Sequence, residues 1–217
     1  MEFLIFMPVL LFSVVVHEVA HALVAKWEGD DTAFRLGRVT LNPIPHLDPM
    51  GSLIVPLFLY LLPGDFLFGW AKPVPVNPGN FRDPKWSDIR VSLAGIAANL
   101  ILAFISTVAL VVIVKVDAYL GASGPFLGIL LQAASFGLLI NLILAFFNLI
   151  PIPPLDGSHV VFHLLPRHLA MKYRDLGKYG IGILMLLLFF FPGSFDVLLW
   201  PVRLLLSVAD LFIGIWV

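Results

Sequence analysis

Two histidines and one glutamate near the N-terminus have the types and spacing for metal chemistry. His17, Glu18 and His21 form the pattern His-Glu-x-x-His, inside an apolar run from Phe3 to Ala25 that has no other ionisable residue. Residues four apart lie on the same face of a helix, so both imidazoles point the same way. Two neutral imidazoles make half of a zinc site, and the intervening glutamate can act as general base toward a water molecule. We therefore expect a metal site and look for its remaining ligand.

The composition is that of a polytopic membrane protein. Of the 217 residues, 60% are hydrophobic and 12% are charged, and the mean hydropathy is +1.00. Soluble domains contain about 25% charged residues. The chain has no cysteine, so thiolate ligands and disulfides are excluded and any zinc must be held by His, Asp or Glu.

Long uncharged segments predict an all-α membrane protein with about five to six transmembrane segments. A helix needs about 20 apolar residues to cross the bilayer. The candidate segments are 3–25, 91–114, 126–147, 179–195 and 197–217. We expect the first three to form a three-helix catalytic core. The chain reads as a single integral-membrane domain over 1–217, with the core at about 1–165 and accessory transmembrane segments at about 178–217.

The loop after the first segment predicts a small re-entrant region of strand and loop. Residues 32–40 suggest a strand that enters a turn, and the prolines of 42–49 exclude a regular helix there. Residues 51–64 are uncharged but too short to span, and Pro56 and Pro63 interrupt them. Residues 72–78 contain three prolines and should be extended.

The basic residues predict the orientation of the chain. Eleven of the thirteen Lys and Arg residues lie in three loops: Lys26, Arg35, Arg38; Lys72, Arg82, Lys85, Arg90; Arg167, Lys172, Arg174, Lys178. The positive-inside rule places all three loops on the cytoplasmic side of the cell membrane. His17 then lies about 13 Å inside the cytoplasmic boundary marked by Lys26.

Asp156 is the candidate for the third ligand. It ends an uncharged run over 118–155 and follows a proline-rich turn. Asp-Gly is also a common turn pair, so Asp156 alone is about as compatible with a turn residue as with a ligand. Irregular backbone at membrane depth is tolerated only where it is buried in protein or lines a wet cavity, which favours the ligand.

With this turn, the sequence resembles the site-2 protease family of intramembrane zinc metalloproteases. The matching residues are the His17-Glu18-x-x-His21 pattern and Asn148-Leu-Ile-Pro-Ile-Pro-Pro-Leu-Asp156-Gly. Residues 42–51 and 70–78 are similar to stretches in compact prokaryotic members, and 92–99 resembles a third motif except at Ile96, where the family commonly has proline. The resemblance covers about residues 1–165 and leaves no room for a PDZ or CBS domain.

The resemblance assigns roles to individual residues. It implies that His17, His21 and Asp156 ligate one Zn²⁺ and that Glu18 activates the water. The substrate-binding candidates are Asn148, Pro151, Pro153 and His46. For His46, a structural place in an interfacial turn and a role in shaping the cleft are equally compatible with the sequence.

The implied function is that of an intramembrane zinc metalloendopeptidase in regulated intramembrane proteolysis. The expected partners are single-span transmembrane substrates and membrane lipid, and no nucleic acid. The sequence does not indicate the oligomeric state. A substrate helix must unwind before it is cut, and a strand edge at 33–41 could receive the opened segment by β-augmentation. The multi-pass chain should lie in the cell membrane with its active site toward the cytoplasm.

Two other functions and several other polar residues fit parts of the sequence. A metal-ion or small-solute transporter also places His and Asp in the membrane, although no repeat of two halves is visible. An inert scaffold with structural zinc would not need Glu18.

His159 and His163 are four apart, but no carboxylate lies between them, so we expect a structural role. For Asn99 and Asn141 we expect interhelical hydrogen bonds.

Overall fold

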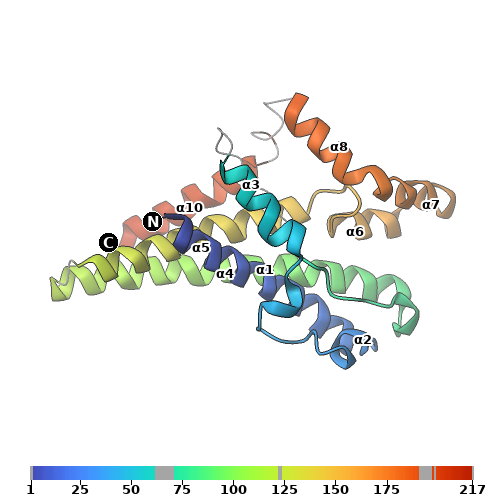
Figure 1. The fold of residues 1–217 in the computed structure, drawn as a ribbon, viewed down its shortest axis with the longest axis horizontal. Helices are drawn as coiled ribbons and strands as arrows, with labels where there is room; N and C mark the ends of the chain where they lie inside the picture. Colours follow the sequence, from blue (N-terminus) through green and yellow to red (C-terminus); the bar gives the residue numbers. More distant parts are fainter. Residues whose placement is uncertain (1, 62–70, 122–123, 191–196, 198, 217) are drawn as a thin grey trace.

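Three long apolar helices form the centre of the fold (Figure 1). α1 (Glu2–Trp27), α4 (Pro84–Leu120) and α5 (Pro125–Asn148) pack against one another. The computed structural model describes residues 2–61, 71–121, 124–190, 197 and 199–216, and in that part these are the three helices long and apolar enough to span a membrane. This is the three-helix core of a membrane protein, as predicted. The count of five to six spans stays a prediction.

The helix ends follow from local chemistry. The Asp83 carboxylate accepts hydrogen bonds from the backbone N–H groups of Lys85 and Trp86, which caps the start of α4. Pro84 then occupies the first turn, where its missing N–H costs nothing. α4 ends at Gly121, whose φ of 58° is a left-handed conformation that glycine adopts without strain.

Shorter helices surround the core. They are α2 (Thr32–Arg35), the 3-10 helices η1 (Ile44–His46) and η3 (Pro78–Asn80), the π-helix η2 (Pro49–Ile54), α3 (Val55–Leu61), α6 (Gly157–Leu164), α7 (Arg167–Asp175), α8 (Gly177–Phe190) and α10 (Trp200–Trp216). α10 lies alongside α4 and α5 (Figure 1), and its Val202 and Ala209 are buried against Ala103 and Leu138. α10 therefore shares an apolar core with α4 and α5.

The predicted strand over residues 32–40 is wrong. Residues 32–35 form α2 instead, and the described residues contain no strand. The reason is local: the buried Asp30 carboxylate accepts from both the N–H and the hydroxyl of Thr32, which turns the chain into a helix. Of the predicted re-entrant segment, η2 and α3 are helical, and residues 62–70 lie outside the described residues.

Residues Lys72–Pro78 are called the strap below. They are non-helical up to Asn77, as their prolines predict, and Pro78 begins η3. Val74 and Val76 of the strap pack near the C-terminal end of α1. The Lys72 N–H donates to the His46 carbonyl over 2.9 Å. The Arg38 guanidinium donates to the Lys72 carbonyl over 2.8 Å. The Asn77 N–H donates to the Asp30 carboxylate over 2.7 Å. The strap is thus held at its beginning and its end by groups from the loop that follows α1.

Candidate metal centre

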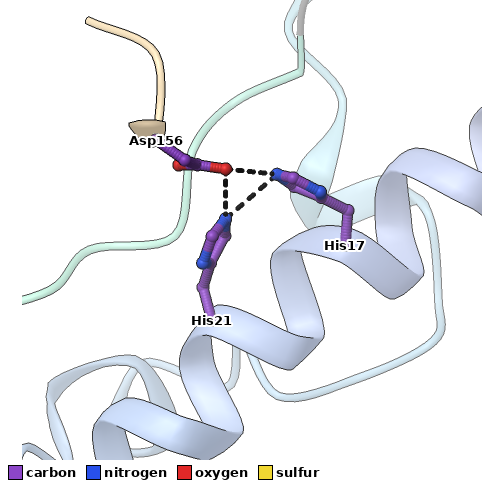
Figure 2. Close-up of side chains that lie close together, drawn as sticks. All are labelled: His17, His21 and Asp156. Atoms are coloured by element: carbon purple, nitrogen blue, oxygen red, sulfur yellow. Dashed lines mark hydrogen bonds and ion pairs between the residues drawn. The ribbon is translucent and has the colours of Figure 1, made fainter. Parts of the chain in front are cut away.

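Three side-chain atoms from two distant parts of the chain meet at one point (Figure 2). Nε2 of His17 lies 3.0 Å from Nε2 of His21. Oδ2 of Asp156 lies 3.2 Å from the first and 3.3 Å from the second of these nitrogens. In the described part of the chain, this is the one group of His, Asp and Glu side chains arranged to hold a metal ion.

The hydrogen bonds on the far side of each imidazole fix which nitrogen carries the proton. His21 Nδ1 lies 2.7 Å from the carbonyl oxygen of Val91, which can only accept, so Nδ1 is the donor. His17 Nδ1 lies 2.6 Å from Oδ1 of Asn99. The Asn99 amide nitrogen donates elsewhere, so its oxygen faces His17 and accepts. Both Nε2 atoms therefore present lone pairs to Asp156.

This arrangement fits a zinc ion. Asp156 Oδ2 is buried and has no hydrogen-bond donor, because both nearby Nε2 atoms are themselves acceptors. Three buried acceptors facing one another are costly unless a cation lies among them. Two imidazoles and one carboxylate are a usual set of three protein ligands for catalytic zinc, which leaves a fourth position open.

Two glycines permit the close packing that brings the ligands together. A side chain on Gly95 of α4 would lie 2.5 Å from His17 Cε1 and from His21 Nε2, so α4 reaches the histidines only because residue 95 has no side chain. A side chain on Gly157 would collide with the backbone carbonyl of Leu149. The turn after α5 can therefore fold back and present Asp156.

A buried amide network connects the metal ligands to the core. The Asn99 amide donates to Asn141 Oδ1 over 2.8 Å, and the Asn141 amide donates to the Ser13 hydroxyl over 2.9 Å. All three residues are fully buried, and they come from α4, α5 and α1. The predicted interhelical hydrogen bonding of Asn99 and Asn141 is confirmed, and the structure adds the contact from Asn99 to a ligand.

Glu18 lines the same cavity as the three candidate ligands. Its carboxylate accepts a hydrogen bond of 2.8 Å from the Val74 N–H of the strap. The cavity has a volume of about 360 Å³. Its walls include His17, Glu18, His21, Asp156, Asn148, Asp88, His159 and strap residues Pro73, Val74, Val76 and Pro78. A carboxylate, an open metal position and room for a peptide therefore share one space.

The structure separates the four predicted substrate-binding residues. Asn148 lines the catalytic cavity, and its amide donates to the Leu144 carbonyl of α5. Pro151 is exposed, and its carbonyl accepts from the Tyr173 hydroxyl. Pro153 is buried beside an adjoining cavity of about 480 Å³. His46 is 1% exposed, donates from Nε2 to the Thr40 carbonyl, and lines a small apolar pocket against α1.

Sequence reasoning did not find Asp88, although a carboxylate near the end of an apolar helix is a usual functional marker. Oδ2 of Asp88 lies 3.0 Å from His159 Nδ1 and 2.7 Å from His163 Nε2. The carboxylate missing between these histidines is thus supplied by another helix. The hydrogen bond to Asp88 raises the pKa of His159, against burial, which lowers it.

Comparisons with known proteins point to one family. Residues 123–190 match the family model described as peptidase family M50. YwhC of Bacillus subtilis, whose name describes a zinc metalloprotease, is 43% identical over 201 residues, 90% of this chain and 85% of that protein. Rip2 of Mycolicibacterium smegmatis, also named for a zinc metalloprotease, is 35% identical over 68% of this chain, which spans 52% of that relative.

Rip2 of Mycobacterium tuberculosis is 30% identical over 88% of this chain and 70% of that protein. No solved structure matches the chain. The predicted family resemblance is confirmed by the relative that matches nearly throughout. The chain belongs to peptidase family M50 and is a zinc metalloprotease.

Proposed function

We propose that this protein is an intramembrane endopeptidase that cuts the transmembrane segments of membrane-anchored substrates. The observation that carries the proposal is the position of the metal centre in the fold. His17 and His21 lie on a helix long and apolar enough to span the bilayer. His17 is ten residues from the end of α1 at Trp27, about 15 Å along the helix axis.

The residues divide the work of peptide hydrolysis among them. His17, His21 and Asp156 hold zinc, which supplies a Lewis acid for the scissile carbonyl and for water. Glu18 accepts the proton of the attacking water and returns it to the leaving amine. The Val74 N–H fixes one oxygen of Glu18 and so orients the carboxylate in the cavity.

The substrate must be unwound where it is cut, because helical hydrogen bonds protect its carbonyl groups. Residues 33–41 do not form the strand edge that was expected to receive the opened segment. The strap is non-helical backbone that lines the catalytic cavity, so we place the opened substrate against it. Asn148 also lines this cavity, and its amide is the group we assign to the substrate backbone.

The same geometry supports the proposed substrate class and location. Single-span proteins can approach the core from the lipid, and the polar loops at the inner ends of α1 and α4 admit water. With these loops in the cytoplasm, the chain is a multi-pass protein of the cell membrane and its site opens inward. Regulated intramembrane proteolysis is the process in which such a cut is useful.

Replacement of Glu18 by Gln tests this proposal. The Gln carbonyl can still accept from Val74, but the amide cannot act as a base. Purified chain in lipid vesicles should cut a panel of single-span substrates at a site mapped by mass spectrometry within the span. Glu18→Gln should retain one zinc per chain and lower the cleavage rate by about 10³-fold or more. Undiminished cleavage by this variant would refute the proposed base, and cuts mapped only outside the span would refute intramembrane proteolysis.

A further inference from the structure

The cluster of Asp88, His159 and His163 is not used by the steps above. Asp88 lies in α4, and the two histidines lie four residues apart in α6. One carboxylate oxygen of Asp88 accepts from both imidazoles, over 3.0 Å from His159 Nδ1 and 2.7 Å from His163 Nε2. The Asp88 side chain is 12% exposed. The cluster therefore joins α4 to α6 just after the ligand Asp156.

The two histidines differ in the cavities that they line. His159 and Asp88 line the catalytic cavity with Glu18 and the zinc ligands, and they also line the adjoining cavity of about 480 Å³. His163 lines the adjoining cavity and is not among the residues that line the catalytic one. The His159 side chain is 47% exposed, whereas that of His163 is 15% exposed. His159 is thus the member of the pair that a substrate in the catalytic cavity can touch.

The hydrogen bond to Asp88 leaves one nitrogen of His159 open. Nδ1 is held by the carboxylate, and within the described residues Nε2 has no hydrogen-bond partner. A carboxylate behind an imidazole fixes the ring orientation and stabilises its protonated form, as in other hydrolytic sites. An imidazolium held in this way donates from both nitrogens, so Nε2 carries an N–H that Asp88 does not use.

Peptide hydrolysis needs a donor of this kind. The water oxygen bonds to the carbonyl carbon, the π electron pair moves onto the carbonyl oxygen, and Glu18 takes the proton of the water. The carbon–nitrogen bond then breaks, and the amine leaves with the proton that Glu18 returns. Negative charge on the oxygen rises and falls during this sequence, and a fixed N–H donor stabilises it most at its maximum.

We propose that His159 is a catalytic residue that donates a hydrogen bond from Nε2 to the carbonyl oxygen of the scissile peptide, and that Asp88 is its positioning residue. The inference rests on the proposed endopeptidase function. It adds His159 as a second electrophilic group, besides the zinc, that acts on the scissile carbonyl. His159 itself neither gains nor loses a proton overall. Zinc binding does not require it.

The first experiment compares His159→Ala with His163→Ala in the full zinc-loaded chain, on a single-span substrate that the wild type cleaves. His163 is the matched control because it bonds to the same carboxylate from the same helix but does not line the catalytic cavity. His159→Ala should lower kcat by about 10²-fold with KM within threefold, which is the loss expected for one oxyanion donor. His163→Ala should change kcat by less than about threefold. His159→Gln, which keeps an N–H donor at similar reach, should recover part of the loss.

The second experiment measures binding without turnover. In a Glu18→Gln background, His159→Ala should leave the affinity for the uncut substrate unchanged. With Glu18 intact, it should weaken binding of a phosphinic peptide, a mimic of the tetrahedral species, by about the same 10²-fold. Zinc content should stay at one per chain in every variant.

Several results would overturn the inference. They are a kcat of His159→Ala within threefold of wild type, an equal loss in His163→Ala, loss of zinc from His159→Ala, or an effect confined to KM. If the wild type cuts no membrane-spanning substrate, the proposed function fails first. If the wild type cleaves the substrate and His159→Ala is fully active, the proposed function stands and only the role of His159 is rejected.

Discussion

His17 and His21 can act as zinc ligands because their other ring nitrogens, the Nδ1 atoms, are held by hydrogen bonds. Asn99 and the Val91 carbonyl each bind an Nδ1–H, so both Nε2 lone pairs face Asp156. Such outer partners fix the tautomer and the ring orientation of a ligand. Neither partner is part of the His-Glu-x-x-His pattern, and both come from α4.

Asn99→Leu should therefore weaken zinc binding. Leucine is branched at the same carbon, although it is larger, and it cannot accept the His17 Nδ1–H, so the imidazole is free to rotate or change tautomer. We expect the zinc Kd to rise about 10- to 100-fold, measured by competition with a chromophoric chelator. Thr107→Val is the matched control, since Thr107 is buried in the same helix but bonds only to the Ala103 carbonyl. An unchanged Kd in Asn99→Leu would show that Asn99 does not support the ligand.

The strap is the element that completes the catalytic cavity, and one buried carboxylate holds its end. Asp30 accepts from the Asn77 N–H and from the Asn80 amide, as well as from Thr32. Burial alone would raise the pKa of Asp30, but these hydrogen bonds hold it below its ordinary 3.8. The same residue therefore forms α2 and anchors the strap.

Asp30→Asn should lower stability by about 1–2 kcal/mol, because hydrogen bonds to a charged acceptor are replaced by weaker ones. The folded pKa is below the unfolded one, so the contribution is present above pH 3.8 and is lost as the pH falls below it. The difference in apparent Tm between wild type and variant should be constant from about pH 7 to pH 5 and shrink below about pH 4.

The neighbouring Asp31 gives a matched control for this measurement. Its carboxylate forms a surface ion pair with Arg35, whose side chain is 76% exposed. Such pairs contribute about 0.2–1 kcal/mol, so Asp31→Asn should move the apparent Tm less than Asp30→Asn. Equal shifts, or a difference that persists at pH 3, would count against the buried carboxylate as the anchor.

At the scale of the whole molecule, the polar elements gather at one end of the core. Figure 1 shows α2, α6 and α7 toward one end of the bundle, and the end of α4 and the start of α5 at the other. Eleven of the thirteen Lys and Arg residues lie between Lys26 and Arg38, between Lys72 and Arg90, or between Arg167 and Lys178. This asymmetry predicts that the end with α2 and α7 is cytoplasmic.

The absence of cysteine makes this orientation measurable with single cysteines. Arg35→Cys lies in the exposed α2, and Tyr119→Cys lies near the opposite end of α4, where Tyr119 is 89% exposed. A membrane-impermeant maleimide should label Arg35→Cys only in inside-out vesicles and Tyr119→Cys only in right-side-out vesicles. The cysteine-free wild type sets the background. The reverse pattern would invert the proposed topology.

The sequence by itself determined the parts of this protein that depend on local pattern. Long apolar runs predicted α1, α4 and α5, because a span is a property of contiguous composition. The spacing of His17 and His21 predicted two imidazoles on one face, because helix geometry is the same everywhere. The strand at 32–40 was wrong because one side chain, Asp30, bonds to the backbone and overrides β-propensity.

Only the tertiary structure decided what meets across the chain. Asp156 reaches the histidines because Gly95 and Gly157 let helices and turn approach, and no spacing rule encodes that approach. Asp88 joins His159 and His163 from 71 and 75 residues away. The local sequence around the two histidines contains no such carboxylate, so it predicts only a structural role for them. Hydrogen bonds between distant segments depend on packing of the whole core, and that is why they lie beyond local sequence patterns.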